Sequence, residues 1–313
     1  MAQPVISYPG AKWRFWKFIK PYIPKDITDF REPFFGGGSI SLSIADDPEF
    51  NLERIVVGDL APEIWAFWTG CRDHAPEVVE IAKEMFTKHC PTQLELGRID
   101  KADMEYMKAY EEAIKEGRDF WKWTQEVDTS KLSIPERAAR TFLVNKISFS
   151  GMGDSGSISK DQFIDFRFDK MDRILAAQPL LQKMEIKNVS FEETMKDVDP
   201  KKSFVFLDPP YYRQESSGLY GRGGDTHHGF PHEHFAEFTK NTNCRWFVTY
   251  DDSIKVRRMF RGKPVLGDKC YITPFVIPGG YTMAGKTAED ALAGEELFIS
   301  NYPLEAVEED LVL

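Results

Sequence analysis

Short apolar segments alternate with longer amphipathic segments along most of the chain. The short segments are rich in β-branched and aromatic side chains, which is the composition of buried strands. This pattern predicts strands at residues 27–31, 55–57, 184–189, 203–207, 245–250, 265–276 and 296–300. The strand at residues 203–207 is strongly apolar, with the sequence Ser-Phe-Val-Phe-Leu.

Helices are predicted where apolar side chains recur every three or four positions. In the N-terminal part these helices cover residues 12–22, 40–45 and 61–71. In the middle part they cover residues 76–88, 103–116 and 135–145. Residues 148–158 are rich in glycine and serine, and we expect them to form a loop or hairpin.

The order of these elements predicts an interrupted α/β domain. A strand, a glycine turn, a helix and a second strand follow one another between residues 27 and 59, which is the βαβ pattern of a nucleotide-binding sheet. Charged helices dominate the middle of the chain, and strands resume after it. We therefore expect a Rossmann-like sheet domain at residues 1–73 and 162–313, with a mainly helical insertion at residues 74–161.

Composition limits the class of protein. Of the 313 residues, 42% are apolar and 13% are aromatic, which is typical of a folded globular protein and not of a disordered chain. The sequence has no run of about 18 apolar residues, so no membrane span is predicted. The start of the chain lacks the pattern of a signal peptide, and the widely spaced cysteines do not fit a zinc site. We expect a cytoplasmic protein.

The charge is unevenly distributed. The formal net charge is -10, which taken alone argues against a protein that binds nucleic acid. The segment after Gly294 contributes strongly to this total, because it carries six acidic residues and no Lys or Arg. Residues 10–31 carry six basic residues against two acidic ones, so the overall acidity does not exclude a local basic surface.

A glycine-rich turn follows the first predicted strand. Its sequence is Phe34-Phe-Gly-Gly-Gly-Ser39, and such a turn allows the backbone to approach a ligand closely. Asp59 follows the next strand, where a carboxylate accepts hydrogen bonds from ribose hydroxyls. A tight turn and a helix-capping aspartate would give the same pattern without a ligand. Together the two features favour a cofactor that contains a nucleoside.

The sequence Asp208-Pro-Pro-Tyr211 follows the apolar strand at residues 203–207. Two consecutive prolines stiffen the backbone and remove two N–H donors, so the turn presents carbonyl and carboxylate acceptors. Tyr211 adds a flat ring on which a planar ligand can stack. Such a group of acceptors suits an amino group that acts as a nucleophile, because it binds the amine's protons and leaves the lone pair free.

These motifs resemble those of the Dam-like N6-adenine DNA methyltransferases, the alpha class of the D12 type. Residues 8–12 resemble the N-terminal element of the family, residues 32–39 its cofactor loop, and Asp208–Tyr211 its Asp-Pro-Pro-Tyr signature. Residues 144–151 resemble the stretch that leads into the recognition hairpin of the family. The pairing of the cofactor loop with Asp-Pro-Pro-Tyr is specific, and the resemblance spans nearly the whole chain.

The resemblance implies a reaction and a set of residues. The cofactor is S-adenosylmethionine, and a methyl group passes to N6 of an adenine that is flipped out of double-stranded DNA. No metal is needed, and the family members are usually monomers. The catalytic residues implied are Asp208, Pro209, Pro210 and Tyr211. The cofactor-binding residues implied are Tyr8, Lys12, Phe34, Gly36, Gly38, Ser39, Asp59, Phe191 and Asp208.

The resemblance and the basic side chains also indicate contacts to DNA. We expect them at Arg137, Arg140, Asn145, Lys146 and Ser150 in the insertion, and at Arg213 and Arg222 in a loop beside the catalytic turn. Residues 152–154 stand where Dam-like enzymes carry a basic residue, so the GATC target of those enzymes is not carried over to this chain. The resemblance places the protein in a bacterial or phage-infected cell, as in restriction–modification systems.

Other functions fit part of the pattern. A methyltransferase that acts on RNA or on a protein glutamine shares the cofactor fold, although the glutamine enzymes usually carry Asn at the position of Asp208. A non-catalytic DNA-binding relative would be expected to have lost the Asp-Pro-Pro-Tyr turn. A dehydrogenase would explain the glycines and Asp59 but not that turn. The histidines near residue 230 also permit a metal site, although DNA contacts or helix capping fit them better.

Overall fold

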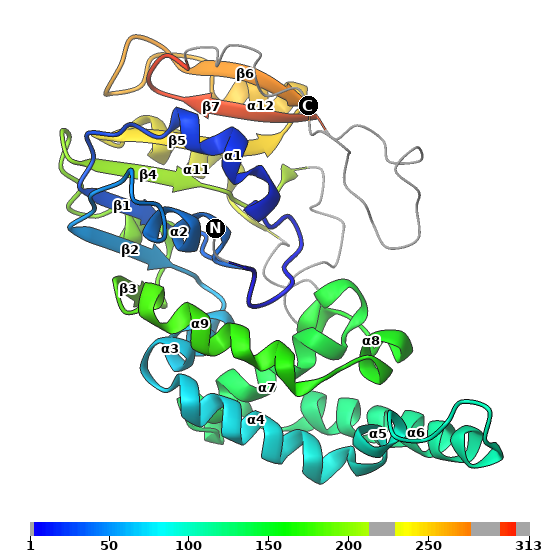
Figure 1. Cartoon of the computed structure of the whole chain (residues 1–313). Coiled ribbons are helices and arrows are strands. Elements are labelled where there is room, and N and C mark those ends of the chain that lie inside the picture. The colour runs from blue at the N-terminus through cyan, green and yellow to red at the C-terminus, as the bar shows by residue number, and fades with distance from the viewer. Residues whose placement is uncertain (1–2, 213–228, 277–294, 305–313) are drawn as a thin grey trace.

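The computed structural model describes residues 3–212, 229–276 and 295–304. Its ribbon has two parts, a twisted sheet flanked by helices and a group of helices below it (Figure 1). The N-terminal segment lies where the two parts meet.

The described residues form one seven-stranded sheet in the order β3-β2-β1-β4-β5-β7-β6. Five strands pair in parallel, and β7 runs antiparallel to both β5 and β6. All five side chains of β4 are buried, which explains its apolar sequence, since strands covered on both faces need no polar positions. The strands are β1 (Asp29–Glu32), β2 (Arg54–Gly58), β3 (Met184–Lys187), β4 (Ser203–Leu207), β5 (Arg245–Asp251), β6 (Tyr271–Val276) and β7 (Glu295–Ser300).

The strand order reverses at β1. The chain passes from β1 to β2 on one side, whereas β4 pairs with β1 on the other side. Ligands of open α/β sheets bind at such a switch point, beyond the carboxyl ends of the strands. The glycine turn, Asp59 and Asp208 all follow strands at this edge. The expected Rossmann-like α/β fold is confirmed.

The segment before β1 differs from the prediction. The continuous helix expected at residues 12–22 is wrong, because the segment divides into a 3-10 turn at Trp13–Phe15, the short helix α1 (Trp16–Ile19) and a second 3-10 turn at Lys20–Tyr22. Pro21 has no N–H to donate to a helix. The helices after the first two strands, α2 (Ser39–Ala45) and α3 (Pro62–Asp73), lie close to their predicted positions.

The middle of the chain is helical, as expected. It contains α4 (Ala75–His89), α5 (Pro91–Leu96), α6 (Met104–Glu126), α7 (Ile134–Ile147) and α8 (Lys160–Ile164). Helix α6 continues ten residues beyond its predicted end at residue 116, through Gly117. A Cβ atom at Gly117 would lie 2.9 Å from the ring of Phe163, so this glycine permits close packing and does not end the helix.

Helix α7 connects the two parts of the molecule. It packs against both α3 and α4, and its N-terminus is fixed by a capping box between Ser133 and Glu136. Phe30 and Phe204 of the sheet belong to the same continuous hydrophobic cluster as Phe86 of the helical part. The sheet and the helical part therefore share one hydrophobic core.

Four further helices cover the sheet or join it to the helical part. They are α9 (Asp172–Leu181), α10 (Phe191–Thr194), α11 (His232–Lys240) and α12 (Ile254–Met259), and none was predicted as a helix of this extent. Helix α9 packs against α3. Among the described residues, the helices are all too short or too polar to cross a membrane.

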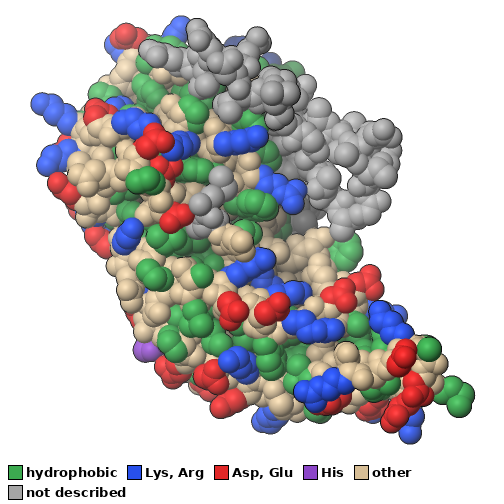
Figure 2. All heavy atoms as spheres, viewed as in Figure 1, with side chains coloured by type: hydrophobic (Ala, Val, Ile, Leu, Met, Phe, Trp, Pro, Cys, Tyr) green, Lys and Arg blue, Asp and Glu red, His purple; other side chains and the backbone are tan. Residues whose placement is uncertain are grey.

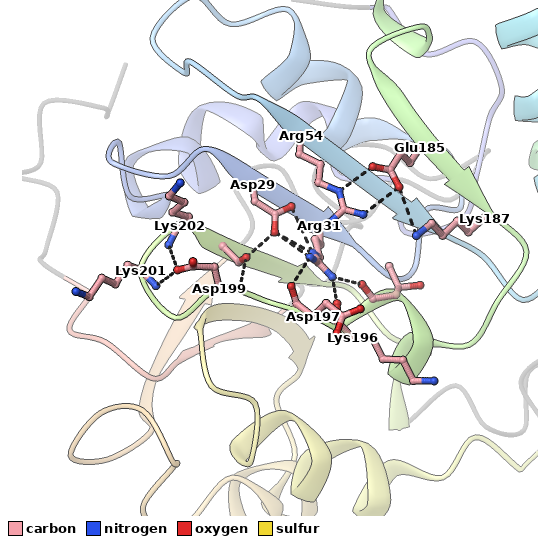
Figure 3. A network of polar contacts seen from close by, with 12 residues as sticks. Asp29, Arg31, Arg54, Glu185, Lys187, Lys196, Asp197, Asp199, Lys201 and Lys202 are labelled. Atoms are coloured by element: carbon pink, nitrogen blue, oxygen red, sulfur yellow. Dashed lines mark hydrogen bonds and ion pairs between the residues drawn. The ribbon is translucent and has the colours of Figure 1, made fainter.

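A buried arginine joins β1 to the turn after α10 (Figure 3). Arg31 donates to the carboxylate of Asp29, and its guanidinium also donates to the carbonyls of Thr194, Lys196 and Asp197. Only 2% of Arg31 is exposed. Because α10 begins with Phe191, which lines the cavity at the carboxyl edge of the sheet, this bonding holds in place a helix that reaches the predicted cofactor pocket.

Replacement of this arginine should strongly destabilise the fold. In Arg31→Ala, three carbonyls lose their donor and Asp29 loses its buried counter-ion, so we expect the free energy of unfolding to fall by about 3–5 kcal/mol. Arg54→Ala is the matched control, because Arg54 pairs with Glu185 at the surface and such exposed pairs contribute about 0–1 kcal/mol. Denaturant unfolding measures both. Equal losses in the two variants would contradict the assigned role of Arg31.

Candidate active site

A cavity of about 1100 Å³ lies at the carboxyl edge of the sheet. Typical small-molecule sites have about 300–1,000 Å³, so the cavity has room for more than one small ligand. Side chains from the glycine turn, from the Asp208–Tyr211 turn and from the helical part line it together. Of the predicted residues, it is lined by Tyr8, Lys12, Phe34, Gly36, Ser39, Asp59, Lys146, Ser150, Phe191, Asp208, Pro209, Pro210 and Tyr211.

The glycine turn supports one wall of the cavity. Gly36 and Gly38 have φ of +44° and +70°, a backbone conformation that glycine adopts without strain. A Cβ atom at Gly36 would lie 2.8 Å from the ring of Tyr8, and one at Gly38 would lie 3.0 Å from Trp68. Gly36 therefore permits the backbone to pass close to Tyr8, which lines the cavity, and Gly38 permits it to pass close to Trp68.

Asp59 is held by the backbone of two turns. Its Oδ2 accepts from the N–H of Gly36 at 2.8 Å, and its Oδ1 accepts from the N–H of Ala61 at 2.9 Å. Each carboxylate oxygen has a second lone pair, so Asp59 can still accept from a ligand hydroxyl. Burial raises the pKa of Asp59 to about 6, although both backbone bonds favour the ionised form.

Aromatic rings line another part of the cavity. The Phe34 ring stacks on Phe191 with 5.8 Å between centroids, and Phe230 meets Phe34 edge to face. Phe191 begins α10, directly after Ser190. Flat apolar rings at this place suit a planar heterocycle.

Asp208 begins the Asp-Pro-Pro-Tyr turn and accepts from two side chains. Thr249 of β5 donates its hydroxyl to Oδ1 at 2.6 Å, and the ammonium of Lys12 lies 3.0 Å from each carboxylate oxygen. Lys12 also donates to the carbonyl of Gly10 at 2.8 Å. Although 196 positions separate them in sequence, Lys12 and the partly buried Asp208 form an ion pair in the wall of the cavity.

The turn continues with two tyrosines in fixed positions. The Tyr211 ring stacks on Tyr250, with 5.9 Å between centroids, and the Lys12 ammonium lies 5.0 Å from the centre of the same ring. The N–H of Tyr212 donates to Asp251 at 2.7 Å. Burial and the nearby carboxylates of Glu296 and Asp208 raise the pKa of the Tyr211 hydroxyl well above its ordinary value, so that group stays protonated.

Sequence reasoning missed two buried carboxylates of this site. Glu32 ends β1 and accepts from the N–H and the hydroxyl of Ser41, and burial raises its pKa to about 8. Glu296 is the second residue of the antiparallel strand β7, and burial raises its pKa too. Glu32 was visible in the sequence as the first residue of the cofactor loop, whereas nothing in the sequence placed Glu296 near Asp208.

Two of the predicted DNA-contacting residues lie at the cavity. Lys146 is the penultimate residue of α7, and burial together with the charges of Arg173 and Lys170 lowers its pKa to about 8. Ser150 has a φ of +53°, unusual for a residue other than glycine, and it is exposed. Figure 2 shows Lys and Arg side chains gathered between the sheet and the helical part.

Three others are bound within the protein. Arg137 pairs with Glu63 of α3, and Asn145 exchanges hydrogen bonds with the backbone of Ser7. Arg140 has no exposed surface, and its guanidinium binds Asp154 and the carbonyl of Thr124. This geometry favours a structural role for Arg140 over a phosphate contact, because a fully buried guanidinium cannot reach DNA.

The remaining predictions concern loops. Arg213 and Arg222 lie outside the described residues. Residues 148–158 close with one antiparallel bridge between Ser148 and Ile158, and the segment between them forms two 3-10 turns in place of a regular hairpin. His232 bonds the Tyr250 hydroxyl and His234 pairs with Glu192. Within the described part of the chain, no cluster of His, Cys, Asp and Glu could hold a metal ion.

Comparison with known proteins agrees with this geometry. The family model of D12 class N6 adenine-specific DNA methyltransferase matches residues 8–267. The Type II methyltransferase M1.LlaDCHI of Lactococcus lactis subsp. cremoris is 25% identical over 240 residues, which cover 74% of this chain and 72% of that protein. The Type II methyltransferase M.CviBI of Paramecium bursaria Chlorella virus NC1A is 22% identical over 273 residues, or 83% and 87% of the two chains.

Proposed function

We propose a ligand for each part of the cavity, because the chain belongs to the D12 class of N6 adenine-specific DNA methyltransferases, which methylate adenine in DNA site-specifically. In this proposal the cavity binds S-adenosylmethionine next to an adenine extruded from the duplex. The observation that carries this proposal is the position of Asp208. Its carboxylate stands in one cavity with the glycine turn, Asp59 and the aromatic wall.

The residues present fit this cofactor. Asp59 has lone pairs for the ribose hydroxyls, and Phe191 offers an apolar ring for the adenine moiety. Three carboxyl groups line the cavity, at Glu32, Asp59 and Asp208, and a fourth, at Glu296, lies next to Lys12. A ligand that carries a sulfonium and an ammonium group compensates such an excess of acidic groups.

The catalytic turn positions the target amine. When bound, the cofactor supplies an electrophilic methyl group. The Asp208 carboxylate and the Pro209 carbonyl accept the protons of the N6 amine, so that its lone pair points toward that methyl group. Tyr211 stacks on the base and fixes its plane. Alignment of the reacting atoms is the main catalytic effect of these residues, and Asp208 lies where it can receive the proton that the amine gives up.

We further propose that the helical part, residues 74–161, meets the DNA. Lys146 and Ser150 lie on the cavity side of this part, where the backbone of an extruded nucleotide would pass. Among the described residues Lys146 forms no ion pair with a carboxylate, and such a lysine suits a phosphate. Arg137 and Asn145 would then affect DNA binding indirectly, because Arg137 holds α7 against α3 and Asn145 holds the N-terminal segment at Ser7.

Transfer of label from tritiated S-adenosylmethionine tests the proposal. We expect incorporation into double-stranded DNA, recovered as N6-methyladenine after hydrolysis, and none into RNA or protein. Sequencing of DNA from an expression host that lacks its own adenine methylation identifies the target site. Label in RNA or in protein glutamine, with none in DNA, would overturn the assignment of the pocket to an extruded adenine.

A further inference from the structure

Glu296 lies beside the catalytic turn, although it comes from a segment beyond the family match, which ends at residue 267. It is the second residue of β7 and pairs in register with Asp251 at the end of β5. Because β7 runs antiparallel to β5, its first residues stand at the sheet edge where the cavity opens. Only 2% of Glu296 is exposed, and a carboxylate is costly to bury without a role.

The contacts of Glu296 lead to two groups of the catalytic turn. Its Oε1 accepts the hydroxyl proton of Tyr211 at 2.8 Å and lies 3.7 Å from the ammonium of Lys12. The same ammonium lies 3.0 Å from both carboxylate oxygens of Asp208. Glu296 is thus connected to the ring on which the base would stack and to the acceptor that would hold the amine.

The ammonium of Lys12 competes with the target amine. A carboxylate offers about four acceptor positions, and among the described residues Thr249 and Lys12 already donate to Asp208. If Asp208 were the only carboxylate next to Lys12, the ammonium would occupy more of the acceptor positions of Asp208. It would also lower the electron density of an amine beside it. The carboxylate of Glu296 also attracts the ammonium of Lys12, and this weakens the hold of Lys12 on Asp208.

We propose that Glu296 is a positioning residue for methyl transfer. It fixes the plane of Tyr211 through the hydroxyl, and it shares the charge of Lys12 so that Asp208 remains available to the amine. Glu296 touches neither the base nor the methyl group, and it acts through these two side chains. The inference rests on the proposed function of the Asp208–Tyr211 turn.

Two substitutions separate the two contributions. Glu296→Gln keeps an oxygen that can accept from Tyr211 but removes the charge, whereas Glu296→Ala removes both. In single-turnover methyl transfer to a duplex with the target site, we expect the rate to fall about 10-fold in E296Q and about 100-fold in E296A. The Kd for S-adenosylmethionine should stay within about threefold of wild type. A duplex with 2-aminopurine at the target position should show a changed fluorescence in E296A.

Glu237→Gln is the matched control, because Glu237 is an exposed acid on α11 that pairs with Lys240, away from the cavity. It should leave the rate and the affinities unchanged. A wild-type rate in folded E296A overturns the proposal, and so does a loss of cofactor affinity as large as the loss of rate, since that result indicates general disruption.

Thermal melting shows whether each variant folds. If E296A does not fold, the rate and the cofactor affinity of E296Q are compared with those of the wild type, and the same two results overturn the proposal. If neither folds, Tyr211→Phe removes the hydroxyl bond from the other side, and a wild-type rate in that variant overturns the proposal. Failure of the wild-type enzyme to methylate adenine in DNA would instead contradict the proposed function, which distinguishes the two failures.

Discussion

Asp208→Ala is expected to reduce single-turnover methyl transfer by about 10²–10⁴-fold, the usual range for removal of a group that takes part in proton transfer. The substitution removes the carboxylate that would accept from the target amine, and it leaves Thr249 without its acceptor. The fold should persist, since Lys12 keeps Glu296 and the carbonyl of Gly10 as partners. Radiolabel transfer to duplex DNA gives the rate, and thermal melting gives the stability.

Asp208→Asn is the matched comparison for this variant. Asparagine retains one acceptor oxygen in the same place but replaces the other oxygen with a donor, and it lacks the negative charge. We expect its rate to lie between those of D208A and wild type. A D208A enzyme that is folded and fully active would show that the amine is held elsewhere.

The second large effect is expected on cofactor binding, in Asp59→Ala. Hydrogen bonds to a charged group contribute about 1.5 kcal/mol or more each, and 1.4 kcal/mol is a factor of ten in affinity. Loss of two such bonds to ribose hydroxyls would raise the Kd for S-adenosylmethionine about 100-fold. The variant also leaves the N–H groups of Gly36 and Ala61 without their acceptor, which loosens the glycine turn. Isothermal titration calorimetry measures the change.

The pH dependence of binding provides an independent check on Asp59. Because burial raises its pKa to about 6, the carboxylate becomes neutral as the pH falls through that value, and a neutral acid is a weaker acceptor for hydroxyls. The wild-type Kd should therefore rise as the pH is lowered from about 7 to 5. Asp59→Asn has no such group and should show a flat profile over this range. The same slope in both proteins would assign the effect to another residue.

The sequence predicted those parts of the site that follow parallel strands. The glycine turn, Asp59 and Asp208 each come directly after an apolar strand, and the carboxyl ends of parallel strands meet at one edge. Helices α3, α4 and α7 were predicted because their apolar positions recur with the helical period and prolines mark their first turns.

The remaining features depend on contacts between distant segments. Glu296 reaches the site because β7 is antiparallel, so that the first residues of β7 lie at the edge where the parallel strands end. The environment of Arg140 was equally hidden, since a charged side chain in a helix resembles a surface residue until its partner Asp154 is known. The helix predicted to end at residue 116 continues to Glu126, and the position of Gly117 against Phe163 shows that tertiary packing overrides local propensity.

The sandwich of α7 between α3 and α4 bears on how specificity can diverge among relatives of this chain. A helical part that shares its hydrophobic interior with the sheet cannot be exchanged as a cassette, because each half would lose apolar partners at the junction. If the helical part meets the DNA as proposed, new target sequences would then arise by substitution at exposed positions of its loop, such as Phe149, Ser150 and Ser157. A chimera that transplants the whole helical part from a distant relative should misfold, whereas substitutions confined to those exposed positions, which spare Gly151 and Asp154, should leave the scaffold intact.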